Sequence, residues 1–394
     1  MGKNYSFYIE YYSKELKQHI NLSEPTWLII SDDIKNFYNS DKSESFSGFL
    51  NTIFKNFYQQ AEASIELRTI EKKESLEKLY SSREFSSFDK KTVSLFIEKY
   101  ANVYEADLKD KALSYPNGHG EKFRINKENL NLLRDSLEAA NYGGSIGLYL
   151  KAIYEEYATK PTYLREQIFF HDTVDTIHKA INEHKKLKLT LHERLTASGF
   201  KRPTRKYYLS PYRIVQDKTN TFNYVIGYSE EIVDQLETDE NGKTRKTSYS
   251  KEKRPACFRI SRIEKCDIQI SMGAKISNEH VSGLEKMLVD RGAMFMSSDP
   301  INIKIRFTSK GLESFKHQLY MRPQFYSIDK EDKYIYNFRC TEIQAINYFF
   351  KFGWDANIIE PTELAEKFKI RYERALKSYK GMTKEEIFAS ETDS

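Results

Sequence analysis

The chain of 394 residues is too long for one hydrophobic core, and its length predicts about two to four domains. Aromatic residues make up 14% of it, with 28 Tyr and 25 Phe, and this apolar content excludes a disordered or low-complexity protein. The formal net charge of +5 is too small to establish a nucleic-acid partner by itself. Local clusters of charge must therefore decide that question.

The N-terminal sequence indicates neither secretion nor insertion into a membrane. MGKNYSFYIEYYSKELKQ interleaves aromatic and charged residues and lacks the apolar core of a signal peptide. No apolar run approaches the length that spans a bilayer. The cysteines Cys257, Cys266 and Cys340 lie far apart, as expected for small core residues in a reducing compartment. We therefore expect a cytoplasmic protein without a membrane partner.

Residues 1–160 are predicted to form a helical domain that contains an internal repeat. In the first copy, residues 26–64, the strand Trp27–Ser31 leads into a helix that starts at Asp32. A Ser-rich break separates it from a second helix, whose apolar face consists of Phe49, Ile53 and Phe57. Charged sequence between the copies predicts an insertion of further helices that ends at the loop YPNGHG.

The second copy, residues 122–158, repeats this order. The strand Lys122–Asn126 precedes a helix from about Lys127 to Ala140, the break 141–145 and a second helix. The apolar face of that second helix consists of Ile146, Leu150, Ile153 and Tyr157. The order resembles the ribbon-helix-helix fold, in which two copies pair their strands into a ribbon that enters the DNA major groove. The sequence leaves open whether the copies pair within one chain or between chains.

Strand alternation predicts which side chains such a ribbon would present to DNA. In the second copy Phe123 would point inward, and Lys122 and Arg124 outward, where they are candidate nucleic-acid contacts. In the first copy the outward residues would be Trp27 and Ile29, which are poor readers of base edges. We therefore expect a retained scaffold in which half of the ribbon cannot read DNA.

Residues 161–206 are predicted to form a long helical connector that begins at Pro161. The strongest basic cluster of the chain lies in its C-terminal part, with Glu193 as the sole acid among Lys185, Lys186, Lys188, Arg194, Lys201, Arg202, Arg205 and Lys206. Such a cluster favours electrostatic capture of an anionic polymer. The residues predicted to do this are Lys201, Arg202, Arg205 and Lys206.

Residues 211–228, PYRIVQDKTNTFNYVIGY, predict a β-hairpin around the turn-forming stretch Gln216–Asn220. The turn signal DENGK and the strands ACFRISRI and KCDIQIS follow, and this density of strands predicts a strongly bent barrel over residues 207–275, with a linker to 300. The hairpin carries Tyr212, Arg213, Tyr224 and Tyr228. These rings could be core residues of the barrel or part of a binding surface, and both readings remain open.

Residues 301–394 predict a C-terminal α+β domain. Strand, helix, strand, strand, helix and strand follow one another from INIKIRF to DANIIE, and the helix PTELAEKFKIRYERALKSY comes last. This βαββαβ order fits a ferredoxin-like arrangement.

Three motifs of the chain resemble the WYL-domain proteins of bacteria. The family hairpin has the form PYRLV, a variable turn and WYLxGY, followed by an FRLxRI strand, and the chain reads PYRIV, NYVIGY and FRISRI. INIKIRF, MRPQF and FKFGWDANIIEPTEL resemble the extension that follows such domains, so the likeness covers about half of the chain, from Tyr207 to Tyr379. The Trp that names the family is Asn223 here, so any role of that indole is absent.

The resemblance implies an α+β multidomain fold: a ribbon-helix-helix-like helical N-terminal part, an Sm-like β-barrel WYL domain and a ferredoxin-like C-terminal domain. WYL domains are implied to bind nucleotides or single-stranded nucleic acid. The N-terminal repeat makes the chain resemble the WYL accessory proteins of type VI-D CRISPR systems, which implies single-stranded RNA binding, enhancement of an RNA-guided RNA-cleaving effector, and a homodimer. The C-terminal domain is the expected interface, but the apolar face of the last helix could equally pack within its own domain, through Leu364, Phe368, Tyr372 and Leu376. No cofactor is implied.

The basic pocket of the family would map onto Arg213, Arg259 and Arg262, with Tyr212, Tyr224 and Tyr228 nearby. Single-stranded nucleic acid is held by a positive groove and aromatic platforms, and arginine can both pair with phosphate and stack on a base. Alternation in FRISRI would put Phe258 and Ile260 on one face and Arg259 on the other. The predicted pocket strands are Pro211–Val215 and Phe258–Ile263.

No catalytic constellation in the sequence is convincing. His171, Asp175 and His178 have helical spacing and could converge on a metal, but the segment reads as an ordinary charged helix. Zinc-protease, phosphate-loop and nucleophile-elbow motifs are incomplete or missing. We expect a binding protein and no metal. The alternative function is a transcription regulator whose ribbon binds duplex DNA under control of a nucleotide or single-stranded nucleic acid in the barrel.

Overall fold

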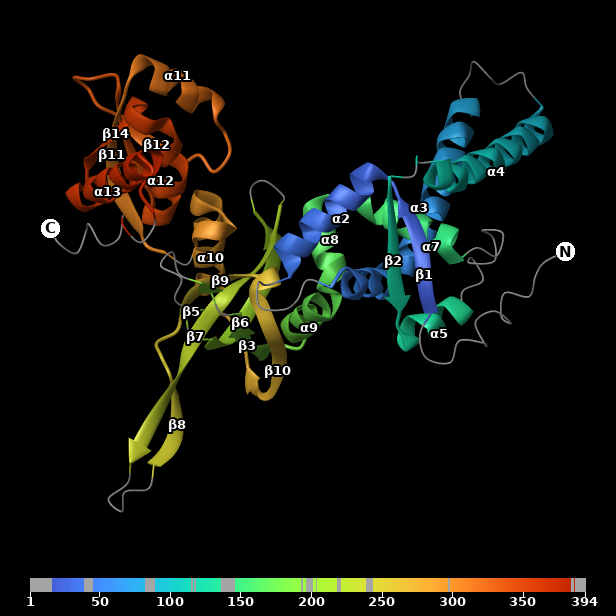
Figure 1. The fold of residues 1–394 in the computed structure, drawn as a ribbon, viewed down its shortest axis with the longest axis horizontal. Helices are drawn as coiled ribbons and strands as arrows, with labels where there is room; N and C mark the ends of the chain where they lie inside the picture. Colours follow the sequence, from blue (N-terminus) through green and yellow to red (C-terminus); the bar gives the residue numbers. More distant parts are fainter. Residues whose placement is uncertain are drawn as a thin grey trace. The chain divides into compact units, whose positions relative to one another are not determined.

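A computed structural model of the chain (Figure 1) describes residues 16–38, 45–81, 89–114, 116, 118–135, 146–192, 194–195, 201–202, 204–217, 221–238, 244–296, 298–383 and 386. It mixes helix and sheet, with a helical N-terminal part followed by a curled antiparallel sheet. Contacts divide the chain into a first unit, Met1–Asp175 with Ile260–Arg262, and a second unit, Thr176–Arg259 with Ile263–Ser394. Within the described ranges, no helix is long and apolar enough to cross a membrane.

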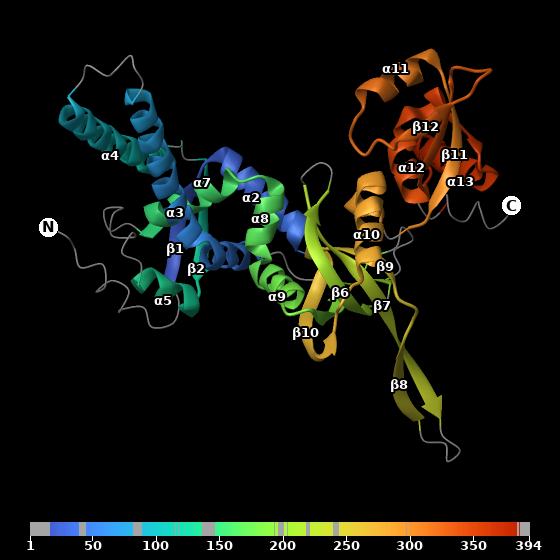
Figure 2. The same cartoon turned by 180° about the vertical axis from the view of Figure 1, so that it is seen from behind.

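The first unit is built on a two-stranded antiparallel ribbon, and β1 and β2 lie side by side in both views of the ribbon drawing (Figures 1 and 2). The strands are β1 (Leu16–Leu22) and β2 (His119–Ile125). Two helices follow each strand: α2 (Glu24–Phe37) and α3 (Phe46–Tyr80) after β1, and α5 (Lys127–Asp135) and α7 (Ile146–Ala158) after β2. The remaining helices are α4 (Lys90–Ser114), between the copies, and α8 (Thr162–Phe169) and α9 (His171–Asn182).

The strand predicted at Trp27–Ser31 is wrong, because these residues lie in α2. The helix is specified at its start: the Ser23 hydroxyl accepts a hydrogen bond from the Thr26 amide at 3.4 Å, and Pro25 occupies the first turn, where its missing N–H costs nothing. Its buried positions recur with helical spacing at Thr26, Ile30, Asp33, Ile34 and Phe37. The first strand is therefore Leu16–Leu22, upstream of the predicted copy.

The second copy agrees with the prediction where it is described. Strand β2 covers most of the expected strand, and Leu150, Ile153 and Tyr157 on α7 are buried as expected. In the first copy Phe49, Ile53 and Phe57 on α3 are likewise buried. The predicted break at 141–145 lies outside the described residues. Phe49, Phe57 and Tyr157 thus contribute aromatic rings to the core between α3 and α7.

Hydrogen bonds at the helix starts join the two copies reciprocally. At the start of α2, the Ser23 amide and hydroxyl each donate to the buried carboxylate of Glu155 on α7, at 2.7 Å. At the start of α5, the Asn126 amide donates to Oδ1 of Asn51 on α3 at 3.0 Å. The first helix of each copy is therefore held by the second helix of the other copy.

A buried ion pair fixes α2 against the end of the repeat. Asp33 is fully buried, and its two carboxylate oxygens accept hydrogen bonds from Nε and Nη2 of Arg165 at 2.6 and 3.0 Å. The Tyr157 hydroxyl also donates to Asp33, at 2.8 Å. Burial raises the pKa of Asp33, and the hydrogen bonds from Arg165 and Tyr157 oppose that shift. Two donors on a forked guanidinium give this contact its geometric specificity.

The second unit begins with a six-stranded antiparallel sheet, in the order β10-β3-β6-β7-β8 with β9 also paired to β7. The sheet curls into a half-barrel, helped by β-bulges at Pro211/Arg213 and Ile263/Lys265. The strands are β3 (Lys185–Leu191), β6 (Arg205–Gln216), β7 (Asn223–Thr238), β8 (Thr244–Ser250), β9 (Arg254–Arg259) and β10 (Ile263–Gly273). The helix α10 (Asn278–Arg291) and the short turn η3 (Ala293–Phe295) follow.

The prediction of a helical connector over residues 161–206 is wrong for its C-terminal part. Helices α8 and α9 end at Asn182, and residues 185–191 form β3 between β6 and β10. Leu187 and Leu189 are fully buried while Lys186 and Lys188 on the other face are not, which is the period of a strand. The abundance of lysine concealed this alternation, and the sheet begins well before residue 207.

The C-terminal part of the second unit is a four-stranded antiparallel sheet in the order β12-β13-β11-β14. Its elements follow the predicted order: β11 (Pro300–Phe307), α11 (Ser309–His317), β12 (Phe325–Ile328), β13 (Ile335–Thr341), α12 (Glu342–Phe349), the 3₁₀ turn η4 (Phe350–Asp355), β14 (Ala356–Glu360) and α13 (Thr362–Tyr379). One face of the sheet packs Ile305, Phe338 and Ile358 against the helices. Polar residues such as Arg306 and Arg339 occupy the other face.

Removing the acid of the buried ion pair should destabilise the first unit strongly. Asp33→Ala leaves the Arg165 guanidinium buried without its counter-charge, and we expect a loss of roughly 3–5 kcal/mol in the free energy of unfolding. Urea unfolding followed by far-UV circular dichroism measures this. The neighbouring exposed acid provides the control, because Asp32→Ala should change stability by about 0.5 kcal/mol or less. Equal effects of the two substitutions would contradict the role given to Asp33.

Candidate nucleic-acid interface

The curled sheet brings the three sequence motifs together on adjacent strands. PYRIV lies on β6, NYVIGY on β7, and the Phe258-Arg259 start of FRISRI on β9, with β7 between the other two. Gly227 of NYVIGY faces Pro211, and a β-carbon there would collide with the Ser210 carbonyl, so the strands can approach closely only with glycine at this position. The motifs therefore specify the pairing of three strands.

Tyr224 and Tyr228 are core residues. They are 7% and 8% exposed and share one face of β7 with Ile226, beneath Leu284 of α10. Burial raises the pKa of Tyr228, whose ring lies 4.5 Å from that of His280. Of the two readings that the sequence left open, the structure supports the core for these two rings. They stabilise the sheet and do not offer an open stacking platform.

Tyr212 and Arg213 reach the surface and meet an acid from α10. Nη2 of Arg213 lies 2.8 Å from Oε2 of Glu285, and the Arg213 side chain is 45% exposed. Tyr212 donates a hydrogen bond to the same carboxylate, which raises the pKa of Tyr212. Glu285 was not among the predicted residues, because its position in the chain gives no sign that α10 returns to the β6 strand.

Arg259 lies flat on an aromatic ring. Its guanidinium carbon is 3.3 Å from the centre of the Phe222 ring, a cation–π contact, and the side chain is partly buried. Arg259 faces Tyr224 and Arg213 faces Ile226 in the ladder, so both arginines lie on the α10 face of the sheet. Phe222 was missed by the sequence interpretation, although it directly precedes NYVIGY.

FRISRI is not one strand, and this corrects the predicted pocket strand Phe258–Ile263. Strand β9 ends at Arg259, residues Ile260–Arg262 form the 3₁₀ turn η2, and β10 begins at Ile263. Alternation from Phe258 onward therefore fails at Ile260. Arg262 lies in the turn, partly buried, and does not share a strand with Arg259.

Two cations of the basic cluster face acids from β7. Lys186 pairs with Glu230 at 2.7 Å, and Arg205 lies 3.8 Å from Glu231. Lys206 is partly buried on β6. Lys201 and Arg202 form β5, which pairs with Arg194–Leu195 (β4), and their side chains lie outside the described residues. The sequence showed Glu193 as the sole nearby acid because Glu230 and Glu231 approach through strand pairing.

The ribbon of the first unit presents polar side chains on both strands, which corrects the expectation of an inactive half. On β2, Lys122 and Arg124 are exposed as predicted, and Phe123 is buried. On β1 the exposed residues are Lys17, His19 and Asn21, while Ile20 and Leu22 are buried. The register pairs Lys17 with Arg124 and His19 with Lys122. The alternation of polar and apolar residues in LKQHINL is the sequence feature that indicates this strand and its exposed face.

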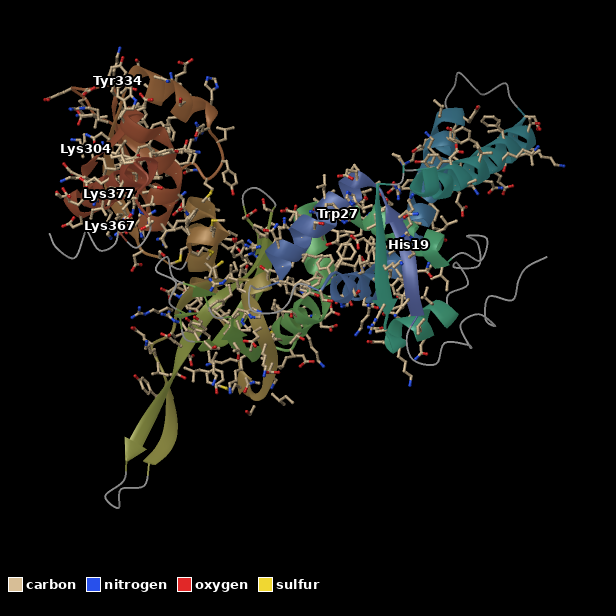
Figure 3. The ribbon with its side chains drawn as sticks, viewed as in Figure 1. His19, Trp27, Lys304, Tyr334, Lys367 and Lys377 are labelled. Carbon is tan, nitrogen blue, oxygen red and sulfur yellow. The ribbon has the colours of Figure 1, made fainter. Side chains whose placement is uncertain are left out.

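Trp27 is part of a cluster beside the ribbon and does not point outward from a strand. Figure 3 shows Trp27 on α2 and His19 on β1. The indole of Trp27 stacks on the imidazole of His119, with ring centres 4.1 Å apart, and its Nε1 donates to Glu121 at 3.1 Å. His119 also lies 2.8 Å from Glu24. Acidic and aromatic groups therefore gather at the Leu22/His119 end of the ribbon.

The described residues contain no group of three or more His, Cys, Asp and Glu side chains placed to hold a metal. In the predicted trio, Nδ1 of His171 lies 3.3 Å from Oδ2 of Asp175, which is an ordinary contact within a helix. Burial raises the pKa of the Cys266 and Cys340 thiols to about 12 and shifts that of Cys257 in the same direction. Burial therefore favours the protonated form of these thiols at neutral pH.

Comparison with known proteins identifies a fold but no family. No family model matches the chain, and no curated protein is detectably similar. A crystal structure described as that of a CRISPR Cas-related protein superposes with a TM-score of 0.64 at 24% sequence identity, over 93% of this chain and 94% of that one. The two chains share one fold. Proteasome accessory factor B/C (PafBC) of Arthrobacter aurescens gives a TM-score of 0.25 at 14% identity, over 67% and 39% of the chains, too low to compare folds.

The core role of the tyrosines can be tested by stability. Tyr228→Ala should lower the free energy of unfolding by about 3–5 kcal/mol, because it opens a cavity under α10. Thermal unfolding followed by circular dichroism measures the change. Tyr249→Ala on β8, where the ring is 50% exposed, is the control and should have little effect. A stable Tyr228→Ala protein that has lost only nucleic-acid binding would show that the ring is a stacking platform after all.

Proposed function

We propose that this chain is a non-enzymatic, single-stranded RNA-binding accessory protein that enhances an RNA-guided, RNA-cleaving effector of a type VI-D CRISPR system. In this proposal the first unit is a ribbon-helix-helix scaffold, the curled sheet is an Sm-like WYL domain, and the C-terminal sheet is a ferredoxin-like domain. The fold shared with a CRISPR Cas-related protein along nearly the whole chain supports this assignment. The protein would act in the cytoplasm and need no cofactor.

The observation that supports RNA binding is the presence of two arginines, Arg213 and Arg259, on the α10 face of the sheet. Arg259 is held flat on Phe222, and Arg213 is about half exposed near the β6–β7 ladder. A planar guanidinium can contact a phosphate or stack on a base, and single strands require both kinds of contact. With Tyr224 and Tyr228 buried, Arg213 and Tyr212 reach the surface on this face, while Nε and Nη2 of Arg259 are buried beside Phe222.

We also propose that the chain forms a homodimer through its C-terminal domain. Large apolar side chains are exposed there, including Trp354 at 82% and Tyr379 at 93%. A shallow cleft between η4, β14 and α13 is lined by Trp354, Ile358, Phe368 and Tyr372. Exposed aromatic groups beside a cleft are common features of protein–protein interfaces.

A second function is favoured by the ribbon. Lys17, His19, Asn21, Lys122 and Arg124 are all exposed on one face of a two-stranded ribbon. Such a ribbon fits the major groove, where lysine, arginine and asparagine read base edges. Duplex DNA is therefore the second candidate ligand, as expected for a transcription regulator. The ribbon belongs to the first unit and the arginine pair to the second, so substitutions can separate the two activities.

Fluorescence anisotropy with single-stranded RNA, single-stranded DNA and duplex DNA tests both functions. The double variant Arg213→Gln, Arg259→Gln should bind RNA at least about tenfold more weakly, because it loses two charge-assisted contacts. Binding by the unchanged protein should weaken with salt by roughly 0.7 log units per log unit for each phosphate neutralised. Arg371→Gln, an exposed arginine of α13, is the control and should bind normally.

The accessory role is tested separately by target-RNA cleavage. The effector should cleave faster with the unchanged protein than with the double variant. Normal RNA binding by the double variant would show that the two arginines do not contribute to the RNA interface. RNA binding without any effect on the effector would leave the binding site intact and refute the accessory role.

Glu285 should limit RNA binding. Oε2 of Glu285 lies 2.8 Å from Nη2 of Arg213, and the same carboxylate accepts a hydrogen bond from the Tyr212 hydroxyl. Glu285 would therefore compete with an RNA phosphate for both groups. Glu285→Gln removes the negative charge and keeps the shape of the side chain. We expect tighter RNA binding, by a few-fold up to about tenfold, with a steeper salt dependence. Glu363→Gln at the exposed start of α13 is the control. An unchanged or weaker affinity in Glu285→Gln would show that Arg213 does not contact RNA.

A further inference from the structure

We infer that the ribbon binds duplex DNA in one orientation and reads a site that lacks two-fold symmetry. This inference rests on the second proposed function, the binding of duplex DNA by β1 and β2. It follows from the difference between the two strands, which one chain supplies in a fixed register.

The two ends of the ribbon carry different chemistry. Lys17 pairs with Arg124 at one end, His19 with Lys122 in the middle, and Asn21 with Gly120 at the other end. Two identical strands related by a two-fold axis would place the same side chains at both ends. Here one end holds two cations, and the other holds an amide opposite a residue without a side chain.

Gly120 also lets the ends of two β1 side chains approach β2 closely. A β-carbon at Gly120 would lie 2.9 Å from Oδ1 of Asn21 and 3.0 Å from the imidazole of His19. The side chains of β1 therefore lean over β2 at this end. Base contacts near Gly120 can come from Asn21 and His19 alone, whereas both strands contribute cations near Arg124.

The charge surrounding the ribbon strengthens this polarity. Glu24 and Glu121 lie at the Asn21 end, where they surround the Trp27–His119 stack. Carboxylates repel DNA phosphates, so the DNA backbone is held less firmly at this end. At the opposite end, the first turn of α5 carries the exposed Lys127, and the acid beside it, Glu128, pairs with Lys55 at 3.0 Å.

The side chains indicate the bases that each end would prefer. Arginine and lysine donate to O6 and N7 of guanine, and asparagine pairs with N6 and N7 of adenine. We expect guanine in the part of the site near Lys17, Lys122 and Arg124, and adenine in the part near Asn21. The site would therefore differ from its own reverse complement. If two chains bound side by side, each half-site would itself lack symmetry.

Selection of duplexes from a random pool by the full-length protein at low salt tests the inference. The enriched sequence should be asymmetric, with guanine at one end. Arg124→Gln should lower the preference for guanine at that end by about tenfold, and Asn21→Ala should relax the adenine at the other end. Lys35→Gln, an exposed lysine near the end of α2, is the control and should select the same sequence as the unchanged protein.

The outcomes distinguish failure of the inference from failure of duplex binding. A two-fold symmetric half-site, or an Arg124→Gln protein that relaxes both ends equally, would overturn the inference and leave the ribbon as a DNA-binding element. Absence of any enriched duplex, or enrichment that survives Lys122→Gln with Arg124→Gln, would refute duplex binding by the ribbon and the inference with it. Binding of single-stranded RNA by the same variants, measured by anisotropy, reports whether the second unit remains functional.

Discussion

The buried carboxylate of Glu155 is the contact on which the first unit depends. Burying a charged group is unfavourable unless hydrogen bonds replace its water, and donors for Glu155 come from Ser23 and Thr26 of the other copy. Asn51 plays the matching role for Asn126. In each case a polar side chain on the second helix of one copy bonds the start of the first helix of the other copy, and these bonds tie β1 to β2. The exposed face of the ribbon therefore depends on these hydrogen bonds between the two copies.

In the second unit, the position of α10 determines which motif residues remain accessible. The helix buries Leu284 against Tyr224 and Tyr228, and it sends Glu285 to the edge of the same surface. The motifs on β6, β7 and β9 therefore divide into two parts: their buried tyrosines and glycine build the sheet, and their arginines carry the charge.

Local pattern predicted the fold where one period dominates a segment. The β6–β7 hairpin was readable from two β-branched and aromatic runs around a turn, and the C-terminal order of strands and helices from the hydrophobic period of each segment. Trp27–Ile30 was misread because a short apolar run does not distinguish a strand from a buried helix face, and the Ser23 cap with Pro25 was the evidence that decided it. Glu285, Glu230 and Glu231 could not be assigned to partners at all, because strand pairing and helix return create those contacts.

Net charge was a poor guide to the candidate binding surfaces for the same reason. Lys186 and Arg205 of the basic cluster face Glu230 and Glu231 across the sheet, whereas the ribbon has few charges in sequence but presents most of them on one face. A polyanion senses the field at the surface that it contacts, and this field depends on which acids lie within a Debye length of about 10 Å. Lys17 and Arg124 face each other across the ribbon, away from Glu24 and Glu121 at its other end. Orientation on DNA would then arise from the order of side chains along two short strands, with no need for a large net charge.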